Sequence, residues 1–130
     1  MIVVDTHVLI FDAIAPSRLT RNAKRVLARE SEAGGICCCD ISLWEIAMLI
    51  FKGRINVKAD PVRFIDDIVQ ALRLSVLPIS PDIAVMAQSG KFMHGDPADR
   101  LIASTAMVHG AELVTADEYL RSIPELKTIW

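Results

Sequence analysis

The chain opens with the stretch MIVVDTHVLI (residues 1–10), in which a short apolar run stops at an aspartate. The consecutive apolar residues 2–4 predict a strand that is buried on both faces. Asp5 ends this run, and the apolar residues 8–10 continue into a short helix or turn. The stretch therefore predicts a buried strand with a polar side chain at its carboxyl end.

The alternation of strand and helix continues along the whole chain. Further strands are predicted at residues 36–39, 75–79, 113–114 and 126–130, and further helices at residues 21–33, 43–51, 61–72, 81–90 and 97–108. Thr20 is typical of a helix start, as are Asp40 or Ser42 before the next helix, and Gly53 ends that helix. Strands that alternate with helices predict the α/β class, with a parallel sheet covered by helices on both faces.

Length and composition favour one small domain with a partner surface. A chain of 130 residues fits a single domain over residues 1–130. Hydrophobic residues make up 52% of the chain and its mean hydropathy is +0.38, more than a domain of this size needs for its own core. No apolar run approaches the roughly 20 residues that span a bilayer, and the first residues do not resemble a basic signal peptide. We expect a cytoplasmic protein.

Charged residues and cysteines give weaker signals. A net charge of −2 produces no general positive field for nucleic acid. Two local basic groups occur, and these are Arg18, Arg21, Lys24, Arg25 and Arg29 on one predicted helix, then Lys52, Arg54 and Lys58 after another. They fit either solvated helix faces or a phosphate-binding surface. The consecutive cysteines 37–39 point to alternate faces of a strand, so they are interpreted as buried, reduced core residues.

Acidic side chains fall where a parallel sheet would bring them together. Ligands of open parallel sheets bind beyond the carboxyl ends of the strands. Asp5 ends the first strand, and Asp117 follows the fourth strand. Asp96 opens a helix near the same edge, and Asp99 lies about one turn further along it. Glu45 lies inside a strongly apolar helix, where a lone carboxylate needs a compensating partner.

We hypothesise that four of these acids converge, namely Asp5, Glu45, Asp99 and Asp117. Each pair of like charges would repel by roughly 4 kcal/mol at a surface-like dielectric, which only protonation or bound cations relieve. Carboxylates without histidine or cysteine suit Mg²⁺ or Mn²⁺ better than Zn²⁺. Such ions share their remaining positions with phosphate, as metal-assisted phosphodiester hydrolysis requires.

Each acid also has a local interpretation that the sequence leaves open. Asp5 is able to cap the turn after its strand, and Asp96 with Asp99 fits a capping box. Asp117 fits an ordinary exposed turn, and Glu45 fits a partly exposed helix position. No single acid decides between a metal site and these structural roles.

The order and setting of the acids resemble the PIN-domain family and, within it, the VapC-type toxins of bacterial toxin–antitoxin pairs. The resemblance rests on the segments MIVVDTHVLI (1–10), ISLWEIAMLIFKGRI (41–55), HGDPADRLIASTA (94–106) and LVTADEYL (113–120). Together these segments span nearly the whole chain, in the order that the family has. The resemblance implies a PIN-like three-layer α/β/α sandwich with a central, mainly parallel sheet of four to five strands.

Carried over residue by residue, the resemblance implies that the catalytic and metal-binding acids are Asp5, Glu45, Asp99 and Asp117. Asp96 matches a further acid that would lie in the outer part of the metal site or cap its helix. Thr115 matches a hydroxyl position that would orient water or a carboxylate, while Thr6 and Arg100 flank acids and either touch substrate or serve the structure. Asp12 departs from the family, in which an aromatic or apolar residue is frequent at this position, so its role stays open.

The resemblance also implies an activity and partners. It implies endonucleolytic cleavage of RNA with Mg²⁺ or Mn²⁺, frequent homodimers, and inhibition by a VapB-like antitoxin whose peptide lies in a groove beside the site. The apolar excess of the chain fits both protein partners. Metal-bound water needs no histidine, so neither His7 nor His94 is expected to act as a general base. His109 is expected only to make a favourable contact with the end of a helix.

Other function classes share part of this pattern. A phosphate-sensing module like a response-regulator receiver also binds Mg²⁺ at strand ends, but it requires paired acids after the first strand, where this chain supplies only Asp5. A phosphatase of the haloacid dehalogenase type requires a second acid two residues later, and DTHVL (5–9) lacks it. A nuclease acting on DNA flaps usually has DNA-binding segments for which this chain is too short. A PIN scaffold that only binds is disfavoured because all four acids are present.

Overall fold

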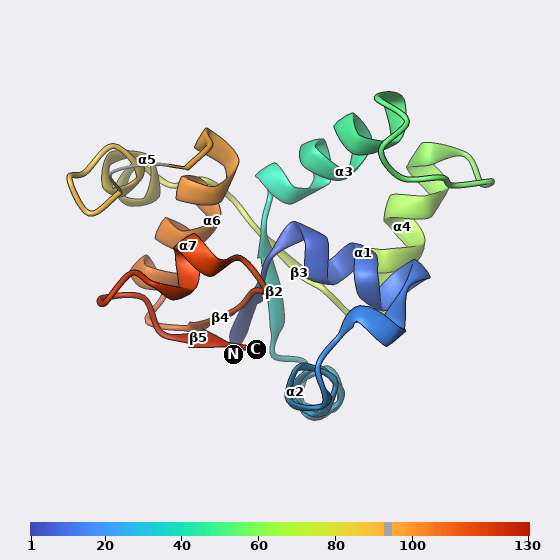
Figure 1. The fold of residues 1–130 in the computed structure, drawn as a ribbon, viewed down its shortest axis with the longest axis horizontal. Coiled ribbons are helices and arrows are strands. Elements are labelled where there is room, and N and C mark those ends of the chain that lie inside the picture. Colours follow the sequence, from blue (N-terminus) through green and yellow to red (C-terminus); the bar gives the residue numbers. More distant parts are fainter. Residues whose placement is uncertain (93–94) are drawn as a thin grey trace.

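A five-stranded parallel sheet forms the centre of the computed structural model, which describes residues 1–92 and 95–130 (Figure 1). The strands are β1 (Ile2–Val4), β2 (Ile36–Cys39), β3 (Ser75–Leu77), β4 (Glu112–Val114) and β5 (Thr128–Ile129). They lie in the order β3-β2-β1-β4-β5, and every adjacent pair is parallel. The predicted parallel sheet is confirmed. The strand predicted at residues 75–79 ends early because Pro78 has no N–H to donate to a neighbouring strand.

Helices cover both faces of this sheet. They are α1 (Thr6–Ile14), the short 3-10 helix η1 (Pro16–Arg18), α2 (Arg21–Ala33), α3 (Ile41–Phe51), α4 (Pro61–Ala71), α5 (Pro81–Ala87), α6 (Pro97–Val108) and α7 (Glu118–Arg121). One core cluster joins the sheet to α1, α2, α3 and α4, and a second joins it to α6 and α7. The three-layer α/β/α arrangement is therefore confirmed. Among the described residues, no helix combines the length and apolar character needed to cross a membrane.

Successive strand residues supply the two cores. Ile2 and Val4 pack into the first cluster and Val3 into the second. Cys38 likewise packs into the first cluster, while its two neighbouring cysteines pack into the second. All three cysteines are buried and form no disulfide, as the sequence predicts. Burial raises the pKa of the Cys38 thiol to about 12, so it stays protonated and behaves as a small apolar side chain.

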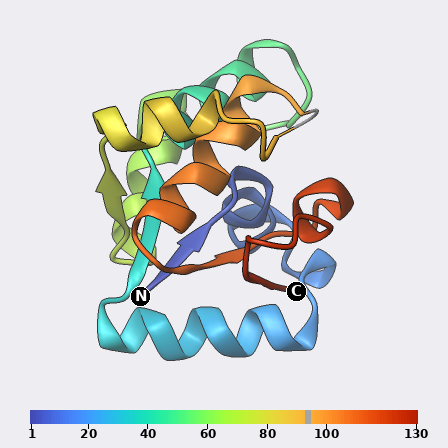
Figure 2. The same cartoon turned by 90° about the vertical axis from the view of Figure 1, so that its left-hand side faces the viewer.

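The two edges of the sheet differ in what lies beside them. Helix α2 crosses the edge where the strands begin, next to both chain termini (Figure 2). Thr20 starts this helix by accepting a hydrogen bond of 3.0 Å from the backbone N–H of Ala23, as predicted. The opposite edge, where the strands end, receives the beginnings of α1, α3 and α6 (Figure 1). Any site at the carboxyl ends of the strands is therefore built from these three helices.

Some local predictions are wrong. Neither Asp40 nor Ser42 caps α3 through its side chain, because Asp40 Oδ2 instead accepts from the backbone N–H of Ile79 and Ser42 lies inside the helix. Helix α3 also presents apolar side chains at the surface, since Trp44 and Phe51 are 60% and 81% exposed. Arg18 is not part of the helix with the other basic residues, because Pro16 starts the separate turn η1.

Candidate metal centre

Five acids line one cavity at the carboxyl edge of the sheet. The cavity measures about 340 Å³, and its acids are Asp5, Glu45, Asp96, Asp99 and Asp117. They come from four places in the chain, namely the end of β1, helix α3, the start of α6 and the segment after β4. The structure therefore brings together all the acids that the sequence analysis selected.

Asp5 is held at the junction of β1 and α1. Its backbone N–H donates to the carbonyl of Val114 at 3.0 Å, which fixes the end of β1 against β4. Its side chain is only 4% exposed. Oδ2 accepts a hydrogen bond of 2.6 Å from the hydroxyl of Thr115, whereas Oδ1 is buried and has no hydrogen-bond partner among the described residues. Burial raises the pKa of Asp5 above its ordinary value.

Thr115 links two of the acids through one hydroxyl group. Its Oγ1 donates to Asp5 and accepts from the backbone N–H of Asp117 at 3.1 Å. Asp117 in turn starts α7, because its Oδ1 accepts from the backbone N–H of Leu120 at 2.8 Å. Since Thr115 is completely buried, this hydroxyl holds the ends of β1 and β4 in one arrangement. The sequence analysis expected an orienting role for this threonine, and the hydrogen bonds support that role.

Replacing Thr115 by valine removes the hydroxyl and keeps nearly the same shape. We expect Thr115→Val to lower the free energy of unfolding by about 1–3 kcal/mol, because buried groups of Asp5 and Asp117 lose their partner. Urea unfolding measures this difference. Thr115→Ser is the matched control, since it keeps the hydroxyl and loses only a methyl group. A valine variant as stable as the serine variant would contradict the assigned role.

Glu45 lies on the inward stripe of α3. The buried residues of this helix are Ser42, Glu45, Ile46 and Leu49, which share one face at helical spacing. Glu45 is only 5% exposed, and its Oε1 has no hydrogen-bond partner among the described residues. Burial raises the pKa of Glu45, and the charges of Asp5 and Asp96 raise it further. The alternative interpretation of Glu45 as a partly exposed surface residue is therefore wrong.

Asp96 and Asp99 occupy the first turn of α6. Oδ1 of Asp96 accepts from the backbone N–H of Asp99 at 2.8 Å, and Pro97 follows at the first helical position. Capping uses one of the two Asp96 oxygens. Glu45, Asp96 and Asp99 each place a carboxylate oxygen within 4.8 Å of the others. Capping and membership of the acidic cluster are thus compatible for Asp96.

The pKa of Asp99 reflects this crowding. Burial is the largest cause of its rise to about 7, and the charges of the other four acids add to it. Among the described residues, no salt bridge joins any of these acids to a lysine or arginine. Among the described residues, His7 is the basic side chain that lines the cavity, and it lowers the pKa of Asp5 and Glu45 by less than burial raises it.

The donor set fits a hard divalent cation. Asp5 Oδ1 and Glu45 Oε1 are buried, and neither has a hydrogen-bond partner among the described residues. An orphaned buried carboxylate oxygen is costly unless a cation or a donor occupies the space beside it. Among the described residues the cavity offers five carboxylates, one histidine and no cysteine, and a donor set dominated by carboxylate oxygens suits Mg²⁺ or Mn²⁺. The local residues therefore meet the requirements of such a site.

A pH effect on stability follows from these pKa shifts. The folded, metal-free protein holds a proton on Asp99 up to about pH 7, whereas the ordinary pKa is 3.8. The folded state thus binds more protons than the unfolded chain between these values, and the free energy of unfolding falls as pH rises through this window. Urea unfolding in EDTA should show a shallower fall for Asp99→Asn than for the unchanged protein. A stability that rises with pH across the window would contradict the shift.

The other predicted residues surround the cluster or lie away from it. Thr6 is fully buried and donates to Ser42 Oγ at 2.9 Å, so it supports the contact between α1 and α3. Arg100 is half-buried, and its Nε has no hydrogen-bond partner among the described residues. Asp12 does not join the site, because it lines a different cavity together with Asp67 of α4.

One histidine and two apolar residues also line the acidic cavity. His7 is exposed and lines it, and its ring lies 6.3 Å from that of Phe11. His94 lies outside the described residues, and His109 is an exposed residue at the end of α6. Sequence analysis missed Phe11 and Ala116, which also line the cavity. Phe11 follows His7 by one helical turn, and this spacing is the signal that places both on one face.

Comparisons with known proteins agree with this geometry. The family model described as PIN domain matches residues 2–126. The chain is 32% identical over 132 residues to Ribonuclease VapC22 of Mycobacterium tuberculosis (strain ATCC 25618 / H37Rv). This alignment covers 99% of this chain and 98% of that protein.

Solved structures share the fold. The crystal structure of VapBC2 from Rickettsia felis, bound to a DNA fragment from their promoter, matches with a TM-score of 0.73 and 20% identity over 99% of this chain and 98% of that chain. A toxin-antitoxin complex from Klebsiella pneumoniae matches with a TM-score of 0.62 and 24% identity over 100% and 97%. The family match, the relative and the shared fold lead to one conclusion. The chain belongs to the PIN-domain family, and to the VapC type within it.

Proposed function

We propose that this chain is a metal-dependent endoribonuclease that hydrolyses RNA phosphodiester bonds, and that it is the toxin of a toxin–antitoxin pair. The single observation that supports this most is the cavity in which five acids meet without a salt bridge to a lysine or arginine among the described residues. The similarity to Ribonuclease VapC22 supports RNA as the substrate. We further propose that residues 1–130 act as a single PIN domain.

The acids have distinct tasks in this proposal. Asp5, Glu45, Asp99 and Asp117 would hold Mg²⁺ or Mn²⁺, with Asp96 at the outer side of the site. Bound divalent cations would activate a water molecule and stabilise the leaving oxygen of the phosphodiester. Thr115 fixes the orientation of Asp5 and Asp117, and Thr6 supports α3 beneath Glu45. Arg100, which follows Asp99 on α6, is the candidate for contact with substrate.

Two alternatives are less well supported. A receiver-like module would need an acceptor aspartate after a middle strand, whereas β3 ends at Leu77 and the next residues are Pro78 and Ile79. A PIN scaffold without catalysis would have no need to keep the carboxylates of Asp5 and Glu45 buried at the cost of their raised pKa values. The acidic cavity therefore favours hydrolysis over both.

Protein partners also belong to this proposal. A largely apolar cavity of about 460 Å³ lies between α3 and α6, directly beside the acids, and Trp44, Met48 and Leu101 line it. Such an exposed apolar surface supports a VapB-like antitoxin, a second copy of the chain, or both, as occupants. We propose that the protein works in the cytoplasm, where its RNA substrates are made.

Metal-dependent cleavage is the direct test. Purified protein should cut labelled single-stranded RNA at internal positions when Mg²⁺ or Mn²⁺ is present, and EDTA should stop the reaction. Adding the metal back should restore it. Equal cleavage with and without EDTA would contradict the metal role, and no cleavage of any RNA with either metal would contradict the activity.

A further inference from the structure

A second cavity adjoins the acidic one and has the opposite charge. It measures about 360 Å³, and Arg18 and Arg54 line it together with His7. No aspartate or glutamate of the described part of the chain contributes to its lining. Its apolar floor includes Leu49 of α3. A site lined by two arginines and no acid is suited to an anion.

The two cavities share part of their lining. His7 and Phe11 of α1 line both of them. The acidic cavity lies on one side of these residues, and the basic cavity, between α1 and the end of α3, lies on the other. A single extended ligand that enters the acidic cavity therefore meets the arginines when it continues past the exposed His7.

The arginines are available for an external ligand. Neither Arg18 nor Arg54 forms a salt bridge with an acid in the part of the chain that the structure describes. The guanidinium carbon of Arg18 lies 4.2 Å from the centre of the Phe11 ring, so stacking restrains this group. Stacking occupies one face of the guanidinium and leaves its N–H donors free at the edge, where they match the oxygens of a phosphate.

We infer that Arg18 and Arg54 form a phosphate subsite for single-stranded RNA, one or more nucleotides away from the phosphodiester at the acidic cluster. The inference rests on the proposed function and names the path of its substrate. RNA suits both cavities at once because it carries successive phosphates. One phosphate would bind the arginines, and another would bind cations held by the carboxylates. His7 is exposed and lies between them, where its ring can contact the intervening nucleotide.

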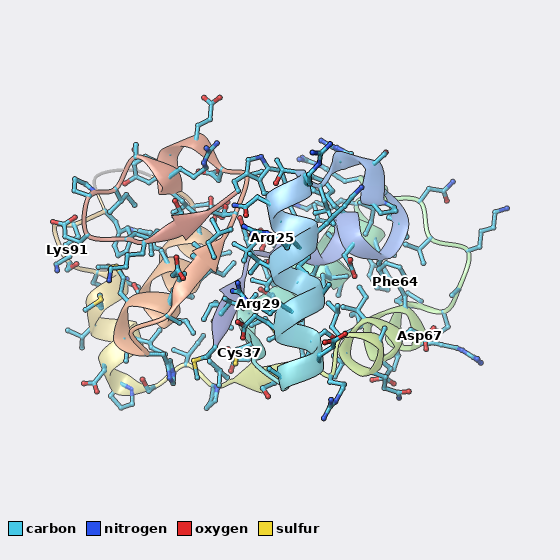
Figure 3. The ribbon with its side chains drawn as sticks, turned by 90° about the horizontal axis from the view of Figure 1, so that it is seen from below. Arg25, Arg29, Cys37, Phe64, Asp67 and Lys91 are labelled. Carbon is cyan, nitrogen blue, oxygen red and sulfur yellow. The ribbon has the colours of Figure 1, made fainter. Side chains whose placement is uncertain are left out.

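Salt-dependent RNA binding tests this subsite separately from cleavage. Asp99→Asn serves as the non-cleaving background, and a short fluorescein-labelled single-stranded RNA reports binding by anisotropy at several salt concentrations. Adding Arg18→Ala or Arg54→Ala should each weaken binding about fivefold and reduce the slope of log affinity against log salt by roughly 0.7, the value for one phosphate contact. Arg25→Ala is the matched control, because Arg25 is exposed on α2 at the far edge of the sheet (Figure 3). Arg25→Ala should change neither the affinity for RNA nor its dependence on salt.

The outcomes separate this inference from the proposed activity. Arginine variants that melt like the background and bind RNA with its affinity and salt slope would overturn the subsite, even if the unchanged protein cleaves RNA. A protein that fails to cleave RNA but shows the two slope changes would retain the subsite and lose the proposed activity. A labelled decaglutamate peptide tests the other class of occupant. If it binds more tightly than the RNA and loses affinity in both arginine variants, the cavity serves an acidic protein segment and the RNA assignment is wrong.

Discussion

Asp5→Asn and Asp99→Asn are each expected to lower the rate of RNA cleavage by at least about a hundredfold, the scale for losing preorganised electrostatic support of a transition state. Each change replaces a carboxylate oxygen of the acidic cavity by an amide N–H₂, which cannot ligate a cation. The size of the side chain is unchanged. Initial rates of cleavage of a labelled RNA at saturating Mg²⁺ measure the effect.

A matched control separates this loss from a general change of charge. Asp66 of α4 is exposed and lies outside the acidic cavity, so Asp66→Asn removes the same charge elsewhere. It should cleave at the rate of the unchanged protein. Circular dichroism should show that all variants remain folded. Full turnover in both site variants would refute the assignment of these acids.

Glu45→Gln is expected to raise the free energy of unfolding of the metal-free protein. It is also expected to remove most of the stabilisation that bound Mg²⁺ provides. Glu45 is buried, its Oε1 lacks a hydrogen-bond partner among the described residues, and other acids surround it. A glutamine amide has nearly the same shape and no charge, so its burial among the acids costs less free energy. Its N–H₂ group is also able to donate to nearby carboxylate oxygens. The free energy of unfolding in EDTA near pH 8 should rise by about 1–3 kcal/mol. Urea unfolding measures this difference.

At saturating Mg²⁺ the unchanged protein should have the higher free energy of unfolding, which is the reverse of the result in EDTA. A ligand that binds only the folded state raises the free energy of unfolding in proportion to the logarithm of its concentration above Kd. The unchanged protein should gain from Mg²⁺, and Glu45→Gln should gain little. Glu32→Gln, an exposed substitution on α2, should behave like the unchanged protein under both conditions. If Glu45→Gln is the less stable protein in EDTA, Glu45 has a stabilising structural partner instead.

Much of the fold was predictable because local signals agree with the tertiary packing. The apolar run of residues 2–4 predicts a strand buried on both faces, and β1 is the central strand with helices on either side. Thr20 and Asp96 predict helix starts, and both accept the expected backbone hydrogen bonds. The meeting of the acids was predictable for the same reason, since the carboxyl ends of parallel strands face one edge.

Other features depend on contacts between segments that are distant in sequence. The hydrophobicity of α3 does not reveal which of its apolar residues lack a cover, and Trp44 is exposed although Ile46 is fully buried. Asp12 lies only seven positions after Asp5, yet it lines another cavity, because Asp5 precedes α1 in extended conformation and Asp12 lies near the other end of that helix. Arg18 is not part of the helix to which the sequence pattern assigns it, because it lies in the separate turn η1, where its guanidinium stacks on Phe11. Burial and cavity lining are tertiary properties, so the sequence pattern alone does not determine them.

Anomalous diffraction from crystals soaked in Mn²⁺ tests the central claim most directly, namely that the acids at the carboxyl edge of the sheet hold a divalent cation. We predict an anomalous peak within coordination distance of carboxylate oxygens of Asp5 and Asp99, and its loss in crystals of Asp99→Asn. A protein saturated with Mn²⁺ that shows no peak in the acidic cavity, or a peak only at another surface, would contradict the account.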